Sequence, residues 1–289
     1  MTIEINGKTR LLGILGEGIS HTLSPLLHNH SARVLGIDQV YVPVDLPAAA
    51  VPGFLTAFWE MGGAGFNVTV PHKELIASMI PGHNLRSVNT VFRGPDGWEA
   101  TSTDGEGFGR GVERLGTPLS GFKKIVILGN GGAAMAILSW LASRFDSPAK
   151  FEVAVLRRNG GKDAAFRQAL PPEFEITCYD FDPMIFRDHV QGRGGETIVI
   201  QTTSAPLRGD ALGGFSQGLA GFRGVVVDIV YGARSALLQK SVSMGLLCQD
   251  GLPMLIEQAR LSQIRWWGEA CPYEELETLA RKKLRGSSR

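Results

Sequence analysis

Residues 123–133 read KKIVILGNGGA, an apolar run that ends in a glycine-rich turn. The run at 123–128 predicts a buried strand, and residues 133–145 predict the helix that follows it. A helix N-terminus exposes backbone N–H groups and glycines let a ligand approach them, so this arrangement is typical of a pyrophosphate site. A tight turn without a ligand also uses glycine, but the flanking strand and helix favour nucleotide binding. The candidate cofactor residues of this turn are Gly129, Asn130, Gly131, Gly132 and Ala133.

The strand after this helix bears on the choice between the two nicotinamide nucleotides. It is expected at residues 151–156, and it completes a unit of the size used by Rossmann-type dinucleotide-binding domains. An acidic residue at its end would bind the ribose hydroxyl of NAD, whereas an arginine suits the 2′-phosphate of NADP. Arg157 and Arg158 stand there with no carboxylate nearby, since Asp163 lies too far along the chain for that role. NADP(H) is therefore favoured and NAD(H) stays open; the alternative is two ordinary surface arginines.

Strand-like and helix-like segments alternate on both sides of this unit, which predicts an α/β fold. The first third of the chain is expected to form a mostly parallel sheet, and a helix at 105–115 leads into the nucleotide-binding part. The length of 289 residues allows one large domain or two of ordinary size. Strands are expected at 11–16, 40–44, 66–70, 89–92, 196–201 and 225–229, and further helices at 24–35, 51–61, from 251 to about 267, and at 273–285.

A second informative stretch is GFNVTVPHKE, residues 65–74, a short strand followed by a turn that presents Lys73. Asn89 and Asp104 each lie at the end of another short apolar segment, so the three side chains could meet around one polyhydroxylated molecule. Oxidation of an alcohol needs a general acid–base group at the reacting oxygen, and a lysine oriented by an aspartate can supply it. The alternative for Lys73 and Asp104 is an ion pair between surface loops.

Residues 21–25, HTLSP, carry two hydroxyls directly before a predicted helix. The hydroxyls of Thr22 and Ser24, together with the helix N-terminus, could receive a carboxylate. The alternative is that Ser24 is an ordinary N-cap residue, followed by a proline at the first helical position.

The composition excludes several classes of protein. With 289 residues, 44% of them hydrophobic, the chain can bury a sizeable core, and its net charge of +1 gives no electrostatic basis for binding nucleic acid or membranes. Three widely spaced cysteines predict neither a disulfide framework nor a metal site, and no metal is expected. No signal peptide or membrane-spanning run is recognised, so a cytoplasmic location is expected.

Taken together, the motifs resemble those of the shikimate/quinate dehydrogenase family, in the same order and from Gly13 to about Gly268. The most similar is NVTVPHK at 67–73, which matches the family's lysine motif. The other stretches that carry the resemblance are HTLSP at 21–25, VNT at 88–90, TDG at 103–105, GNGGA at 129–133, TTS at 202–204, DIVY at 228–231 and GLPMLIEQ at 251–258.

This resemblance implies roles for individual residues. Lys73 and Asp104 would form the catalytic pair, and Thr202, Ser204 and Gly251 would belong to the cofactor site. Thr22, Ser24 and Tyr231 would face the substrate carboxylate, while the ring hydroxyls would be held, directly or through supporting groups, by Asn67, Thr69, Asn89 and Gln258.

The resemblance also implies the activity and the domain boundaries. Residues 1–104 and 250–289 would form a discontinuous substrate-binding domain to which the last helices return, and residues 105–249 the NADP-binding domain. The expected reaction interconverts 3-dehydroshikimate and shikimate with NADP(H), by a monomer or homodimer acting on a small cyclic hydroxy acid.

Several positions depart from the family pattern and leave the substrate open. Thr22 replaces a serine, Ser102 replaces an asparagine, and the link from Lys73 to Asn89 is short enough that a helix there is expected to be trimmed. Quinate, aminoshikimate or another cyclic hydroxy acid are alternative substrates. A nucleotide-responsive binding module without turnover is the alternative of a different class.

Overall fold

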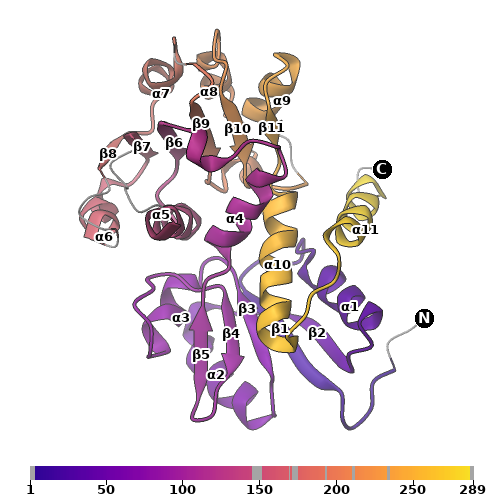
Figure 1. Ribbon diagram of the computed structural model, residues 1–289. Coiled ribbons are helices and arrows are strands. Elements are labelled where there is room, and N and C mark those ends of the chain that lie inside the picture. The colour runs from indigo at the N-terminus through magenta and orange to yellow at the C-terminus, as the bar shows by residue number, and fades with distance from the viewer. Residues whose placement is uncertain are drawn as a thin grey trace. The chain divides into compact units, whose positions relative to one another are not determined.

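The computed structural model describes residues 4–144, 152–168, 170, 175–192, 194–209, 212–232 and 235–286. The chain divides into two compact units, one of Met1–Asp104 with Ile256–Arg289 and the other of Gly105–Leu255. The first unit is therefore assembled from two separate stretches of chain (Figure 1). Across the described ranges, every helix is too short or too polar to cross a bilayer.

The sheet of the first unit has five strands in the order β2-β1-β3-β4-β5. The pairs β1–β2 and β1–β3 are parallel, whereas β3–β4 and β4–β5 are antiparallel, so the sheet is mixed and not mostly parallel as the sequence predicted. A short turn joins β4 to β5, with Gly94 N donating to Gly97 O, and so short a connection joins antiparallel neighbours only. The strands are β1 (Arg10–Gly16), β2 (Gln39–Asp45), β3 (Gly65–Val68), β4 (Thr90–Arg93) and β5 (Trp98–Thr101).

The helices of the first unit cover this sheet with apolar faces. A cluster of buried residues joins β1 and β3 to α2 and α3, with Phe58 and Phe66 at its centre. A second cluster contains Tyr41 of β2 and Trp266 of α10. The helices are α1 (Ser24–Val34), α2 (Val51–Glu60), α3 (Lys73–Met79) and α11 (Tyr273–Gly286), while α10 (Leu252–Trp267) begins in the second unit and continues into the first.

The sheet of the second unit has six strands in the order β11-β10-β9-β6-β7-β8, and every pairing in it is parallel. The chain thus starts at β6, winds outward to β8, and returns to the other side of β6 with β9. This is the strand order of doubly wound dinucleotide-binding folds, whose ligands bind where the winding reverses. The strands are β6 (Lys124–Leu128), β7 (Glu152–Arg157), β8 (Ile176–Asp180), β9 (Thr197–Gln201), β10 (Val225–Asp228) and β11 (Cys248–Gln249).

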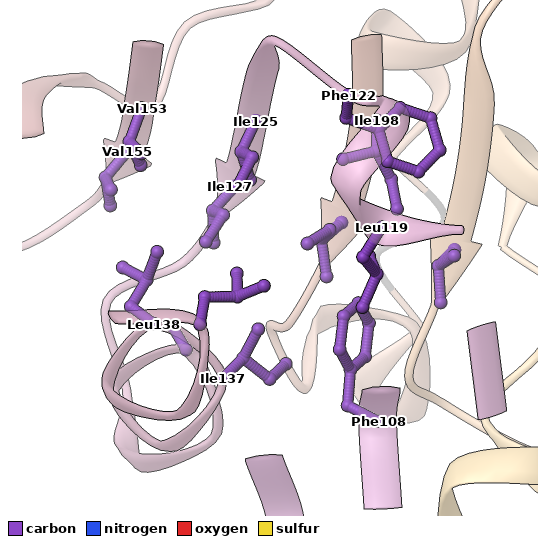
Figure 2. Packing of buried hydrophobic residues seen from close by; sticks show 14 of the residues in the cluster. Phe108, Leu119, Phe122, Ile125, Ile127, Ile137, Leu138, Val153, Val155 and Ile198 are labelled. Atoms are coloured by element: carbon purple, nitrogen blue, oxygen red, sulfur yellow. The ribbon is translucent and has the colours of Figure 1, made fainter. Parts of the chain in front are cut away.

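The helices of the second unit pack against both faces of its sheet through two buried clusters. Figure 2 shows Ile125 and Ile127 of β6 with Ile137 and Leu138 of α5 in the first cluster. The strands are buried almost throughout because both faces of the sheet are covered. The helices are α4 (Asp104–Glu113), α5 (Gly132–Arg144), α6 (Asp163–Gln168), α7 (Pro183–Val190), α8 (Gly213–Gly218) and α9 (Ala236–Ser243).

The structure also departs from the sequence-based expectation in individual elements. β3 ends at Val68, and Lys73 is the first residue of α3, a helix of 7 residues. Ser24 is not an N-cap: Leu23 holds that position and no side chain caps α1, so the alternative role of Ser24 as a capping residue is wrong. The strands β5, β8 and β11 were not anticipated, because β5 is only partly buried and β11 has 2 residues, too short for a recognisable apolar pattern.

Candidate active site

One edge of the first sheet gathers the predicted catalytic pair and most of the predicted substrate residues. β1 and β3 are parallel, so their carboxyl ends, which lead to Thr22 and to Lys73, lie at the same edge. β4 runs the other way and begins there with Asn89 just before it, while β5 returns and delivers Asp104. The alternation of strand direction therefore brings residues from four strand ends to a single edge.

Lys73 and Asp104 form a close ion pair at this edge. Lys73 Nζ donates to Asp104 Oδ2 at 2.6 Å, and the two side chains are 16% and 6% exposed. Asp104 is also the first residue of α4, where the helix dipole favours a negative charge. The pair is therefore largely shielded from water, unlike the ion pair between exposed loops that the sequence left as an alternative.

Asn89 holds the other oxygen of this carboxylate. Its Nδ2 donates to Asp104 Oδ1 at 2.8 Å and also contacts Thr103 Oγ1 at 2.9 Å and Gln258 Oε1 at 3.3 Å. Its Oδ1 accepts the Thr103 backbone N–H at 2.8 Å. Because both ends of the buried amide are engaged, Asn89 fixes the orientation of Asp104.

Asn67 lies one layer further inside and does not present its amide to a ligand. Its side chain is buried; Nδ2 donates to Asn89 O at 3.0 Å and Ser262 Oγ at 3.0 Å, and Oδ1 accepts the Tyr41 hydroxyl at 2.7 Å. Two roles were expected for Asn67: direct contact with the substrate hydroxyls, or support of the groups that make this contact. Its hydrogen bonds are those of a supporting residue.

Three members of this network were assigned no role from the sequence: Tyr41, Thr90, although it lies in the VNT motif, and Ser262. Thr90 Oγ1 lies 2.9 Å from Ser262 Oγ, and Ser262 donates to the carbonyl of Gln258 at 3.0 Å. One signal was available for Ser262, because it follows Gln258 by four positions on α10 and so shares its helix face. For Tyr41, a lone tyrosine in an apolar strand carries no comparable signal.

His28 of α1 closes the inner end of the network by packing rather than hydrogen bonding to Tyr41. Its ring stacks on Tyr41 with centroids 4.3 Å apart and meets Trp266 at 5.3 Å. Burial lowers the pKa of His28 to about 3, with the Asn67 amide opposing the shift. The same burial raises the pKa of Tyr41. Both groups are therefore neutral around pH 7.

Thr22, Ser24 and Thr69 lie beside the carboxyl ends of β1 and β3. The Thr22 and Ser24 hydroxyls are 3.2 Å apart at the start of α1, so the structure brings together the hydroxyl pair that the sequence proposed. The Thr69 N–H donates to Leu15 O at 2.9 Å. Gly16 allows Thr69 to pack closely, since a Cβ at Gly16 would lie 2.5 Å from Thr69 Cγ2.

In the second unit, the glycine turn follows β6 at the point where the winding reverses. Gly129 has a φ of +112°, and a Cβ there would lie 2.7 Å from Thr202 Oγ1, so only glycine fits. Around Gly131, by contrast, nothing lies within 4 Å of a built Cβ. Gly132 begins α5, whose N-terminus suits an anion. The turn therefore fits a pyrophosphate.

The end of β9 lies next to this turn because the Thr202 N–H and hydroxyl both donate to Leu128 O, at 2.9 and 2.8 Å. Gln201 accepts the Thr203 N–H and donates to the buried Asp228, so it braces the segment that leads to Ser204. Burial raises the pKa of Asp228. The Ser235 hydroxyl and the Val230 N–H oppose this shift, because both donate hydrogen bonds to the carboxylate.

Tyr231 and Gly251 follow the neighbouring strands β10 and β11 in the second unit. A Cβ at Gly251 would clash with the backbone of Ile229, so this position requires glycine for packing. The predicted ligand contacts of Tyr231 and Gly251 stay predictions.

Arg157 does not have the environment expected from the sequence. Its guanidinium binds Asp163 through Nε and Nη2, at 3.0 and 2.8 Å, and Asp180 through Nη1 at 2.5 Å. The premise that no carboxylate is near is therefore wrong, because a turn and a neighbouring strand bring both acids back to the end of β7. Arg158 instead lies with its guanidinium 4.8 Å from the centre of the Phe181 ring.

The two units define a class of protein when taken together. A doubly wound parallel sheet with a glycine turn at its switch point, and a separate unit with a shielded lysine–aspartate pair, are the parts of a nucleotide-dependent α/β oxidoreductase.

Comparison with known proteins gives the family. A family model for the shikimate dehydrogenase substrate binding domain matches residues 14–91. The shikimate dehydrogenase (NADP(+)) of Magnetococcus marinus is 32% identical over 288 residues, which cover 97% of this chain and 98% of that protein. The chain belongs to the shikimate dehydrogenase family.

Solved structures agree with this assignment. The crystal structure of shikimate dehydrogenase from Aquifex aeolicus has a TM-score of 0.82 and 28% identity, covering 96% of this chain and all 100% of that one. A shikimate 5-dehydrogenase from Thermus thermophilus in complex with NADP(H) and shikimate has a TM-score of 0.75 and 25% identity, covering 95% and 99%. The predicted family and two-part α/β fold are confirmed.

Proposed function

We propose that this protein is an NADP-dependent dehydrogenase that interconverts shikimate and 3-dehydroshikimate. The observation that carries the proposal is the shielded Lys73–Asp104 pair, held by Asn89 at the sheet edge where the family's substrate motifs meet. Relatives along nearly the whole chain bear the name shikimate dehydrogenase (NADP(+)), which supports both the substrate and the nucleotide.

Lys73 and Asp104 divide the proton chemistry of the reaction. In the oxidation direction, the C3 hydroxyl of shikimate becomes a ketone, and its proton passes from the oxygen to Lys73. Asp104 orients that hydroxyl and holds the lysine amine beside it. One carboxylate oxygen of Asp104 accepts a hydrogen bond from Lys73 and the other accepts one from Asn89, so the carboxylate is fixed in position. In the reduction direction, Lys73 returns the proton to the same oxygen.

The remaining substrate contacts come from the same unit and from Tyr231. We assign the carboxylate to the hydroxyls of Thr22, Ser24 and Tyr231, and the ring hydroxyls to Thr69 and Gln258, with Asn89 supporting Gln258 and Asp104. The pairing of Thr22 with Ser24 and the bond between Asn89 and Gln258 support this division. Asn67 acts behind these groups as a positioning residue.

The second unit would hold NADP(H), which when bound supplies the hydride exchange at C3. The glycine turn at residues 129–133 would receive the pyrophosphate, and Thr202, Ser204 and Gly251 would line the nicotinamide side. On this assignment residues 1–104 and 250–289 form the substrate domain and residues 105–249 the nucleotide domain. The cytoplasmic location and the monomeric or homodimeric state stay predictions.

Thr22 favours a second candidate substrate class, other cyclic hydroxy acids such as quinate or aminoshikimate. A threonine at this position adds a methyl group to the residue whose hydroxyl pairs with Ser24, so the part of the site that would take the carboxylate differs from one built on serine.

A steady-state panel of shikimate, quinate and aminoshikimate with NADP⁺ and NAD⁺ tests these assignments. The highest kcat/KM is expected for shikimate with NADP⁺. A higher value for quinate or aminoshikimate would transfer the assignment to that substrate. Tight NADPH binding without turnover of any of the three would point to the non-enzymatic binding module instead.

A further inference from the structure

The end of β7 carries a three-member charge cluster made of Arg157, Asp163 and Asp180. Arg157 reaches Asp163 with two nitrogens and Asp180 with the third, so every nitrogen of the guanidinium already faces a carboxylate. The side chains are 15%, 21% and 87% exposed, in that order. The cluster therefore holds two negative charges against one positive charge.

This cluster lies next to the glycine turn. Asn130 of that turn donates from Nδ2 to Asn159 O at 3.1 Å, which ties the turn to the loop after β7. Within the loop, the Gly161 N–H donates to Asn159 Oδ1 at 3.0 Å, and a Cβ at Gly160 would lie 3.3 Å from Arg157 Nη2. The guanidinium thus lies against the loop after β7, the segment that receives the adenosine ribose in dinucleotide-binding folds.

A ribose 2′-phosphate responds strongly to the charge at this place. Arginine attracts it through charge-assisted hydrogen bonds, whereas a carboxylate repels it. The 2′-hydroxyl of NAD carries no charge and is nearly indifferent to the same field. Whatever changes the charge balance at the end of β7 therefore changes the preference between the two nucleotides.

We propose that Arg157 sets the preference for NADP over NAD from a distance, by neutralising Asp163 and Asp180, and not as a ligand of the 2′-phosphate. Arg158, which lies over Phe181, presents the cation to that phosphate. Arg157 is on this view a positioning and charge-balancing residue. The inference rests on the proposed function, because it assumes that the nucleotide binds at this turn.

The proposal predicts opposite effects for the two kinds of charge. Arg157→Gln leaves two carboxylates uncompensated, so NADP⁺ binding should weaken about tenfold while NAD⁺ binding changes less than about twofold. Asp180→Asn removes one repelling charge, so NADP⁺ should bind about threefold tighter. The combined variant Arg157→Gln/Asp163→Asn/Asp180→Asn should bind NADP⁺ within about threefold of the wild-type chain.

The experiment measures Kd for NADP⁺, NAD⁺ and adenosine 2′,5′-bisphosphate by calorimetry with the full chain, in low salt and again at high salt. High salt should shrink the effect of Arg157→Gln, since mobile ions screen it. Arg187→Gln on α7 is the matched control, because it removes one exposed arginine elsewhere in the same unit and should leave all three affinities unchanged. Circular dichroism and thermal unfolding check that each variant is folded.

Failure to restore NADP⁺ binding in the combined variant would overturn the proposal, because it would mean that Arg157 contacts the phosphate itself. An equal loss of NAD⁺ and NADP⁺ in Arg157→Gln would overturn it as well, by showing general damage to the loop. If Arg157→Gln does not fold, Asp180→Asn decides alone: unchanged or weaker NADP⁺ binding contradicts the proposal. A wild-type chain that binds neither nucleotide would instead refute the proposed function, and this inference with it.

Discussion

The charge clusters of the two units differ in how they are satisfied. In the first unit, Lys73 and Asp104 are shielded from water and connect through Asn89 to a buried network of amides and hydroxyls. In the second, Arg157 joins two acids of which Asp180 is almost fully exposed. Buried hydrogen bonds thus fix the positions of the charged groups in the first cluster, whereas in the second cluster the main feature is the attraction between one arginine and two carboxylates. Changes in the first should therefore affect turnover and folding, and changes in the second should affect nucleotide choice.

The largest effect is expected on turnover when Lys73 of the first cluster is removed. Lys73→Ala should lower kcat with shikimate by about 10³-fold, because it removes the group assigned to exchange the proton of the C3 hydroxyl. Initial rates with NADP⁺ measure it, with Lys123→Ala as control, since Lys123 is 73% exposed and pairs with Glu196. Near-wild-type turnover in Lys73→Ala would remove the lysine from the mechanism.

The second largest effect is expected when Asn89, which holds Asp104 of the Lys73–Asp104 pair, is removed. Asn89→Ala frees one oxygen of Asp104 and leaves the buried Thr103 N–H unpaired, so kcat should fall about 10²-fold and unfolding free energy by about 2 kcal/mol. The Kd for NADP⁺ should stay constant, since the nucleotide residues belong to the other unit. Loss of stability with unchanged kcat would reduce Asn89 to a purely structural role.

His28 should give the first unit a distinct dependence of stability on pH. Its folded-state pKa of about 3 lies below the ordinary value of 6.5, so the unfolded chain binds the proton more readily. The contribution is complete above pH 6.5 and is lost progressively as the pH falls toward 3. Between pH 6.5 and 5 the loss should be about 2 kcal/mol.

Urea unfolding of the wild-type chain and of His28→Phe over this pH range checks that prediction. The variant should show a correspondingly flatter pH dependence, whereas His21→Gln, an exposed histidine in the same unit, should follow the wild type. Identical slopes for the wild type and His28→Phe would contradict the assigned burial of a neutral imidazole.

The smallest effect is expected from the exposed acid of the second cluster. Asp180→Asn should change the unfolding free energy by less than about 0.5 kcal/mol, because an exposed ion pair gains little over hydration. Urea unfolding of Asp180→Asn and of Asn89→Ala at the same pH measures the change in unfolding free energy for each. A loss as large as that of Asn89→Ala would erase the contrast between the two clusters.

Much of the candidate site was readable from local pattern. The glycine turn was predicted because its chemistry resides in consecutive residues between a recognisable strand and helix. Lys73, Asn89 and Asp104 were predicted because each follows or precedes a short apolar segment, and their grouping at one edge is what the sheet topology provides. The hydrogen bonds of Asn67 could not be predicted, since Tyr41 and Ser262 are 26 and 195 positions away.

By itself, the sequence determined the α/β class and the family and singled out candidate residues for the chemistry, because these depend on periodicity and on motifs of neighbouring residues. Only the tertiary structure decided which of those side chains have their polar groups engaged by other residues of the chain. Asn67 became a support and Arg157 a partner of two acids because hydrogen bonds and ion pairs depend on distances of about 3 Å. Such distances are set by how strands pair and turns fold back, and spacing along the chain does not contain them.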